Sequence, residues 1–104
     1  MKSLEEIRQQ LYSEEFQLTR HALKRQTERN ISNDEIREIS ENVVIIEDYP
    51  DDKYAPSSLL LGFTKTDRAL HIQVSRMESD VTKIITLYEP NQNDWIDFKV
   101  RRIN

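Results

Sequence analysis

The 104-residue chain contains no cysteine, a single glycine and three prolines. The lack of cysteine excludes a disulfide framework, a thiolate zinc site and a cysteine nucleophile, and it suits a reducing cytoplasm. The scarcity of glycine excludes motifs that cradle phosphate with several glycines, such as the P-loop and the dinucleotide-binding fingerprint. Because the first eight residues are mostly polar and charged and no apolar run reaches membrane-spanning length, we expect a soluble cytoplasmic protein with no membrane partner.

The charge of the chain is acidic and uneven, with a formal net charge of −4. An acidic total argues against a protein that coats nucleic acid by bulk electrostatics, although it leaves room for a local basic groove. Leu, Ile, Val and Phe make up 28 of the 104 residues, which is enough for a folded core. We therefore expect a single domain over residues 1–104, with an N-terminal helical extension at about residues 3–14.

The first third of the chain has the apolar spacing and the capping residues of helices. The third helix has the strongest signature, because Ser32 and Glu35 match a capping box. Asn30 suits the left-handed conformation that ends a helix. The predicted helices cover residues 4–13, 20–30 and 33–41 and are capped by Ser3, Thr19 and Ser32.

From Val43 onward the spacing changes to that of strands. Strands over residues 43–46, 59–64, 69–75 and 81–88, separated by turn residues, predict an antiparallel meander of about four strands. Helices followed by strands imply an α+β fold with the helices packed on one face of the sheet. The segment from Trp95 onward could be helix or strand. The expected core consists of Ile31, Ile36, Ile39, Ile46, Leu61, Phe63, Leu70, Ile72, Val74, Ile85, Leu87 and Trp95.

A basic row marks the predicted second helix. His21, Arg25 and Arg29 recur every four residues, so one face of the helix carries all three. With Lys24 beside them, they form a patch whose guanidinium groups can bind a phosphate or a carboxylate, either on a nucleic acid or on a partner chain. The alternative is a solvated helix face in which Glu28 pairs with Lys24 or Arg25.

Two residues of the predicted sheet are further candidates. His71 lies on the polar side of its strand, where it is either a proton carrier or a hydrogen-bonded structural histidine. Tyr88 ends the last long strand, where it either belongs to a site or covers the sheet edge. The two histidines match no metal-ligand spacing, so we expect neither a metal ion nor another cofactor.

The motifs in combination resemble a known family. The pattern H-x-x-x-R-x-x-x-R-x-I-S from His21, a Tyr49-Pro50 turn and a late Tyr88-Glu89-Pro90 resemble the bacterial family called domain of unknown function 4258, over most of residues 16–98. The resemblance implies no assigned activity. By fold-level analogy, the order of elements is similar to that of small RelE- and BrnT-type toxins, several of which cut RNA. The acidic total and the helix over residues 4–13 depart from those toxins.

Two functional classes follow. In the first, which the acidic charge favours, the chain is a non-enzymatic protein-binding or assembly module whose basic face meets an acidic partner protein or antitoxin. In the second, it is a metal-independent ribonuclease or another nucleic-acid-directed protein. Arg25 and Arg29 then hold phosphates, His21 or His71 acts as acid or base, and Tyr88 positions the 2′-hydroxyl. Because the chain is acidic, we expect its RNA binding to be weak. The oligomeric state is not indicated by the sequence.

Overall fold

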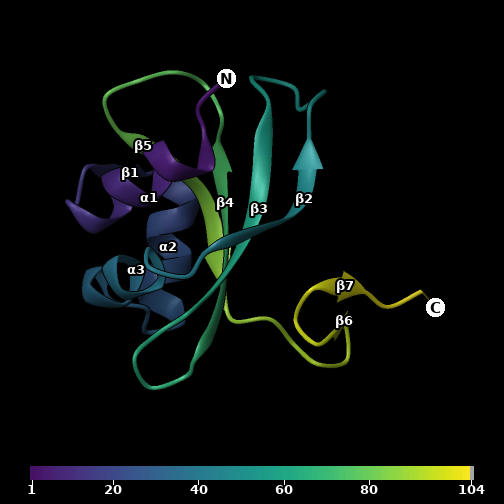
Figure 1. The fold of residues 1–104 in the computed structure, drawn as a ribbon. Helices are drawn as coiled ribbons and strands as arrows, with labels where there is room; N and C mark the ends of the chain where they lie inside the picture. The colour runs from purple at the N-terminus through teal and green to yellow at the C-terminus, as the bar shows by residue number, and fades with distance from the viewer. Residues whose placement is uncertain (104) are drawn as a thin grey trace.

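The computed structural model describes residues 1–103 and shows helices followed by a twisted β-sheet (Figure 1). The α+β class predicted from the sequence is confirmed. No helix among these residues has the length and apolar character needed to cross a membrane. The elements are α1 (Leu4–Tyr12), β1 (Phe16–Leu18), α2 (Arg20–Glu28), α3 (Asn33–Ile39), β2 (Val44–Tyr49), β3 (Ser57–Phe63), β4 (Ala69–Ser75), β5 (Thr82–Tyr88), β6 (Trp95–Ile96) and β7 (Val100–Arg101).

Each helix begins at the cap predicted for it. The hydroxyl groups of Ser3, Thr19 and Ser32 accept a hydrogen bond from the backbone N–H three residues further on. Glu35 completes the capping box, because its carboxylate accepts a hydrogen bond from the Ser32 N–H at 3.0 Å. Asn30 has a φ of 52°, so it follows α2 in the left-handed conformation expected from the sequence.

The main sheet has five strands in the order β1-β5-β4-β3-β2. Strands β2 to β5 pair antiparallel, but β1 joins the sheet parallel to β5, with Phe16 opposite Thr82 and Leu18 opposite Ile84. The predicted antiparallel meander of about four strands is therefore present as β2 to β5, but it is not the whole sheet, because β1 makes the sheet five-stranded and mixed. The three residues of β1 are too short to show a strand period, and their partner lies near the other end of the chain.

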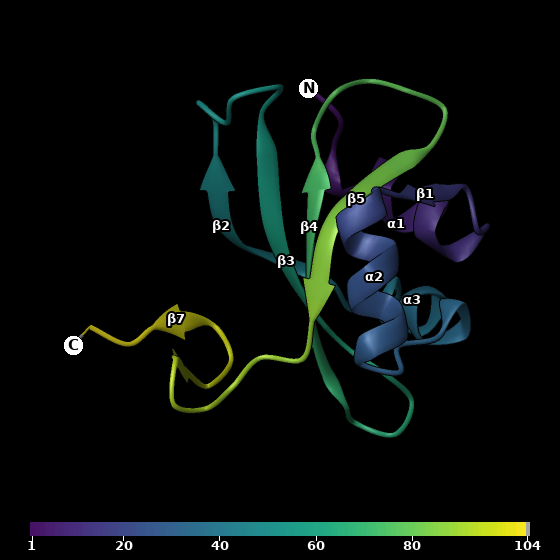
Figure 2. The ribbon, with the colours of Figure 1, turned by 180° about the vertical axis from the view of Figure 1, so that it is seen from behind.

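All three helices contribute to one core that covers a face of the sheet (Figure 2). The single glycine, Gly62 in β3, lies under α3, where a Cβ would come within 2.5 Å of the Ile39 Cβ. The helix can therefore approach the sheet this closely only at a residue without a side chain. The buried members of the core are Ile7, Leu11, Ala22, Ile31, Ile36, Ile39, Val43, Leu60, Leu70, Ile72, Val74, Ile84 and Leu87.

Three residues predicted for the core are only half-buried. Ile46 and Ile85 lie where the strand pairing shifts register at a bulge, and the extra residue changes which side chains face the helices. In β5 this places Ile84 in the core instead of Ile85. Phe63 ends β3 and packs edge-on against Phe98, with 6.0 Å between the ring centroids.

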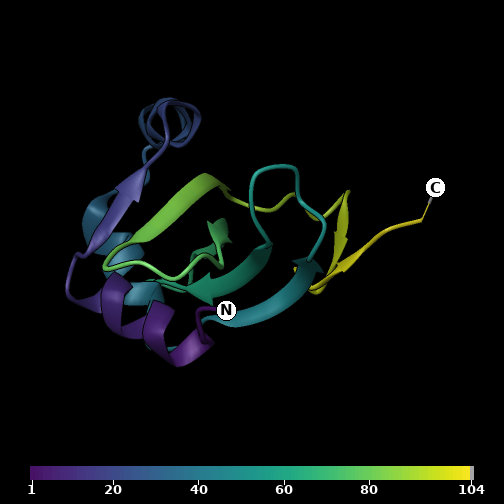
Figure 3. The same cartoon turned by 90° about the horizontal axis from the view of Figure 1, so that it is seen from above.

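The segment that could have been helix or strand forms a small two-stranded hairpin, β6–β7. Its turn contains Asp97 and Phe98, which both have positive φ. The hairpin lies on the side of the sheet away from the helices (Figure 3). Its Trp95 is buried against His71 of β4, with 4.5 Å between the ring centroids. This hairpin brings a second group of side chains to the end of β5.

Candidate functional site

Helix α2 packs beside the part of β5 that continues past β1. Thr19 fixes the start of the helix, because its N–H donates to the Ile84 carbonyl at 3.0 Å and its hydroxyl donates to the Ile85 carbonyl at 2.8 Å. Ala22 of the helix is buried in the core. The neighbouring row that begins at His21 is consequently turned away from the core and toward the end of β5.

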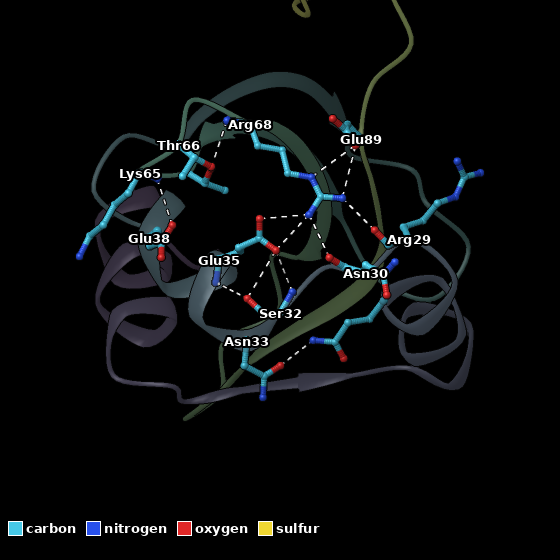
Figure 4. A network of polar contacts seen from close by, with 12 residues as sticks. Arg29, Asn30, Ser32, Asn33, Glu35, Glu38, Lys65, Thr66, Arg68 and Glu89 are labelled. Carbon is cyan, nitrogen blue, oxygen red and sulfur yellow. Dashed lines mark hydrogen bonds and ion pairs between the residues drawn. The ribbon is translucent and has the colours of Figure 1, made fainter.

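Arg68, in the turn before β4, holds the other end of α2 (Figure 4). Its guanidinium group donates to the backbone carbonyls of Arg29 at 2.8 Å and Asn30 at 3.0 Å. The same group donates to both carboxylate oxygens of Glu35 at 3.0 Å and to Glu89 at 3.3 Å. Arg68 thereby joins the end of α2, the first turn of α3 and the residue after β5.

The electrostatics of this network favour the charged forms of both partners. Burial alone would raise the pKa of the Glu35 carboxyl, but the hydrogen bonds from the Ser32 backbone and from Arg68 outweigh burial and bring that pKa below its ordinary value. Burial alone would lower the pKa of the Arg68 guanidinium, but the hydrogen bonds and charges of Glu35 and Glu89 raise it. The network is thus an ion pair at neutral pH.

A hollow of about 370 Å³ lies between the basic row of α2 and the end of β5, and we call it the α2–β5 hollow. The basic row and Tyr88, which the sequence combined in one site under the ribonuclease hypothesis, line this one hollow. Trp95, from the β6–β7 hairpin, forms part of its wall. The lining residues are His21, Arg25, Arg29, Thr86, Tyr88, Glu89, Asn91, Asp94 and Trp95.

The two arginines of the hollow differ in their partners. Arg25 lies 3.7 Å from the Glu28 carboxylate, in an exposed pair that contributes little to stability. Arg29 has no carboxylate within ion-pair distance among residues 1–103. Lys24 is highly exposed, pairs with Glu28 at 3.9 Å and does not line the hollow. The structure therefore places Arg25 and Arg29, but not Lys24, beside Tyr88.

His71 does not reach the hollow, because it is fully buried behind Tyr88. Its Nε2 lies 2.6 Å from the Phe98 carbonyl oxygen, which can only accept, so Nε2 carries the proton. Its Nδ1 then accepts a hydrogen bond from the Tyr88 hydroxyl at 3.2 Å. Burial lowers the pKa of His71, although the bond to Phe98 opposes that shift. This geometry matches the structural histidine that the sequence left as an alternative.

Tyr88 connects His71 to the hollow. Burial raises the pKa of its phenol to about 12, so the hydroxyl stays protonated and acts as a hydrogen-bond donor. The ring packs edge-on to His71, with 5.2 Å between the centroids. Tyr88 is thereby held in one orientation at the wall of the hollow.

Sequence reasoning did not single out several contributors to this site, among them Arg68, Asn91 and Asp94. Arg68 lies far from α2 in sequence and has no motif that links it to the helix. Asn91 and Asp94 belong to a polar loop that was expected only to connect two segments. Their position just after the Tyr88-Glu89-Pro90 motif is the one sequence signal that could have indicated them.

The hollow combines the guanidinium groups of Arg25 and Arg29 with the imidazole of His21. Two guanidinium groups provide planar donors that match phosphate or carboxylate oxygens. Among residues 1–103, no three His, Cys, Asp or Glu side chains come together as a metal-binding group.

Comparison with known proteins identifies a family. Neither the curated proteins nor the solved structures contain a significant match to the chain. The model of the family described as Domain of unknown function (DUF4258) matches residues 18–89. This segment runs from the end of β1 to the residue after β5, and so contains His21, Arg25, Arg29, His71 and Tyr88. The chain therefore belongs to the DUF4258 family.

Proposed function

We propose that this domain acts on single-stranded RNA and binds a phosphodiester of the strand in the α2–β5 hollow. The supporting observation is that the basic row of α2 and the end of β5 meet in one hollow. A solvated helix face, the alternative left by the sequence, needs no such wall of aromatic residues. Arg25 and Arg29 hold the phosphate oxygens in this proposal, and Tyr88 and Trp95 restrict the approach of the strand.

His21 is the proton carrier in the proposed cleavage. The 2′-hydroxyl of the bound strand attacks the adjacent phosphorus while His21 takes up the proton of that hydroxyl, and the two arginines stabilise the charge on the phosphate oxygens. The bond from phosphorus to the 5′-oxygen of the next nucleotide breaks, and that oxygen takes a proton from water. The products are a 2′,3′-cyclic phosphate and a strand with a free 5′-hydroxyl. His71 does not serve here, because both of its ring nitrogens are hydrogen-bonded inside the protein. Tyr88 has a positioning role, since its raised pKa keeps the phenol protonated, so that it neither gives up its proton readily nor takes up another.

A protein-binding or assembly module with an acidic partner is the second candidate. It is favoured by the net charge of −4, which opposes the binding of any polyanion, and by the pairing of Arg25 with Glu28. An acidic peptide offers carboxylates to the same guanidinium groups without the charge density of RNA. The two candidates therefore share Arg25 and Arg29 but differ in ligand.

The test is a titration of labelled single-stranded RNA at several salt concentrations, followed by fluorescence anisotropy. We expect weak binding whose log–log salt slope is about −1.4, from about −0.7 for each of two arginine contacts. The Arg25→Ala/Arg29→Ala variant should lose binding but keep its fold, because both side chains are exposed or half-exposed. Lys24→Ala is the matched control, since it removes a charge from the same helix outside the hollow.

Cleavage is measured separately with the same RNA and with its 2′-deoxy analogue. His21→Ala should lower the cleavage rate by about 100-fold or more with little change in RNA affinity, and the analogue should not be cut. Absence of RNA binding at low salt together with absence of cleavage would contradict the proposal. In that case a glutamate-rich peptide replaces RNA in the same titration and tests the second candidate.

A further inference from the structure

A second hollow adjoins the α2–β5 hollow at the β6–β7 hairpin. It measures about 290 Å³ and is lined by Tyr88, Asp94, Trp95, Arg101 and Arg102. The first three of these residues also line the α2–β5 hollow, so the two hollows lie on either side of a shared wall. Each hollow contributes its own pair of arginines.

The arginines of the second hollow are held by the hairpin. The Arg101 guanidinium lies over the Trp95 ring, 4.6 Å from its centroid, and bonds to the Glu47 carboxylate at 3.0 and 3.2 Å. Arg102 donates from its backbone to the Asp94 carbonyl at 2.9 Å and from Nε to the Gln92 carbonyl at 2.8 Å. The hairpin itself is attached to the sheet through the bond from His71 to the Phe98 carbonyl.

The two arginines are not equivalent as anion-binding groups. The charge of Arg101 is already matched by the two oxygens of Glu47. Arg102 has no carboxylate within ion-pair distance among residues 1–103, and its side chain bonds through Nε to the Gln92 carbonyl. Arg102 is therefore the main cation of the second hollow.

We infer that the second hollow is a phosphate subsite and that the ligand is an oligonucleotide strand with at least two phosphodiesters. This inference rests on the proposed function. One phosphodiester lies in the α2–β5 hollow with Arg25 and Arg29, and the next one along the strand lies with Arg102.

Asp94 explains why two separate subsites form. Asp94 lines both hollows, and its negative charge repels a phosphate placed close to it, while the arginines of each hollow attract one. In a nucleic-acid strand, charged phosphates alternate with neutral sugars. A sugar can therefore lie next to Asp94 while the phosphate before it lies in one hollow and the phosphate after it lies in the other. A free phosphate ion or a mononucleotide can occupy only one of the two subsites.

The inference can be tested with 2′-O-methyl oligouridylates of two and three nucleotides. They carry one and two phosphodiesters and cannot be cleaved, because the 2′-oxygen is blocked. Dissociation constants at low salt are measured by NMR titration of the ¹⁵N-labelled protein. For the wild type, the salt slope should steepen by about 0.7 between the two ligands, as expected for one more phosphate contact.

The variants separate the two subsites. Arg102→Ala should weaken binding of the trinucleotide several-fold and leave the dinucleotide unchanged, whereas Arg29→Ala should weaken both. Lys99→Ala is the matched control, because it removes a charge from the same hairpin but lines neither hollow. Arg102→Lys should restore much of the trinucleotide affinity, which a purely structural role of Arg102 would not predict.

The measurements distinguish failure of the second subsite from failure of the proposed function. If Arg29→Ala weakens binding but Arg102→Ala has no effect on either ligand, the second subsite is refuted and the proposed function stands. If neither ligand binds to the wild type at low salt, the proposed function fails and the inference fails with it. Thermal unfolding of each variant shows whether a loss of affinity comes from a loss of fold.

Discussion

The substitution Arg68→Ala tests whether the network in Figure 4 holds α2 in place. It removes the partner of Glu35, whose side chain is only 20% exposed, and leaves the carbonyls at the end of α2 without their donor. A partly buried charge-assisted pair contributes about 1.5–3 kcal/mol, and the exposed contact with Glu89 adds at most about 1 kcal/mol. We expect the free energy of unfolding to fall by about 2–4 kcal/mol.

The matched control is Arg37→Ala. Arg37 also contacts two carboxylates, at 3.8 and 3.9 Å, and the Tyr12 carbonyl at 3.2 Å, but its side chain is 41% exposed. Its loss should cost about 0–1 kcal/mol. Urea denaturation at pH 7 measures both variants. Equal effects of the two substitutions would refute the argument that partial burial and the helix-end carbonyls make the Arg68 network strong.

The pH dependence of the same variant gives a second measurement. Because the pKa of Glu35 is lower in the folded protein than in the unfolded chain, the folded state binds fewer protons around that pKa. The stabilisation is therefore complete above the ordinary value of 4.5 and is lost as the pH falls through the folded-state pKa. The difference between the wild type and Arg68→Ala should shrink below about pH 4. A difference that stays constant down to pH 3 would contradict the assigned ion pair.

Two further substitutions test the core and the buried histidine. Gly62→Ala should destabilise the protein by more than about 2 kcal/mol in urea denaturation. The new Cβ would lie 2.5 Å from the Cβ of Ile39, and no rotation of either side chain relieves that clash. An unchanged denaturation midpoint would show that α3 does not approach the sheet so closely. His71 has a lowered pKa in the folded state, so the unfolded chain binds its proton more readily, and stability should fall as the pH drops below 6.5. This fall should be smaller in His71→Gln, and an NMR titration that gives His71 a pKa at or above 6.5 would contradict its burial.

Much of the local structure could be predicted from the sequence, because short-range chemistry decides it. A capping hydroxyl bonds to a backbone N–H three residues away, so Ser3, Thr19 and Ser32 marked the helix starts. Alternating apolar residues similarly marked β4, whose bounds agree with the prediction. The basic row of α2 followed from helical periodicity alone.

The sequence indicated that successive strands pair in a meander, but it did not indicate how more distant segments pair. The parallel position of β1 and the bulges that exchange Ile85 for Ile84 in the core arise from pairing between strands, which no local pattern encodes. For the same reason Arg68 was not recognised as the anchor of α2. Its partners come from three segments that only the folded chain brings together.

At the candidate site, the two histidines show the same difference between what the sequence predicted and what the tertiary structure decided. The sequence proposed both as proton carriers, because imidazole is the side chain that most often serves as an acid or a base in proteins. The tertiary structure buried His71 between Tyr88 and the Phe98 carbonyl, and it left His21 exposed beside two arginines. Residue type and helical spacing in the sequence therefore determined which side chains were candidates for binding and proton transfer. Burial and long-range packing decided which of these candidates line the hollow, because the access of solvent to a side chain depends on the whole fold.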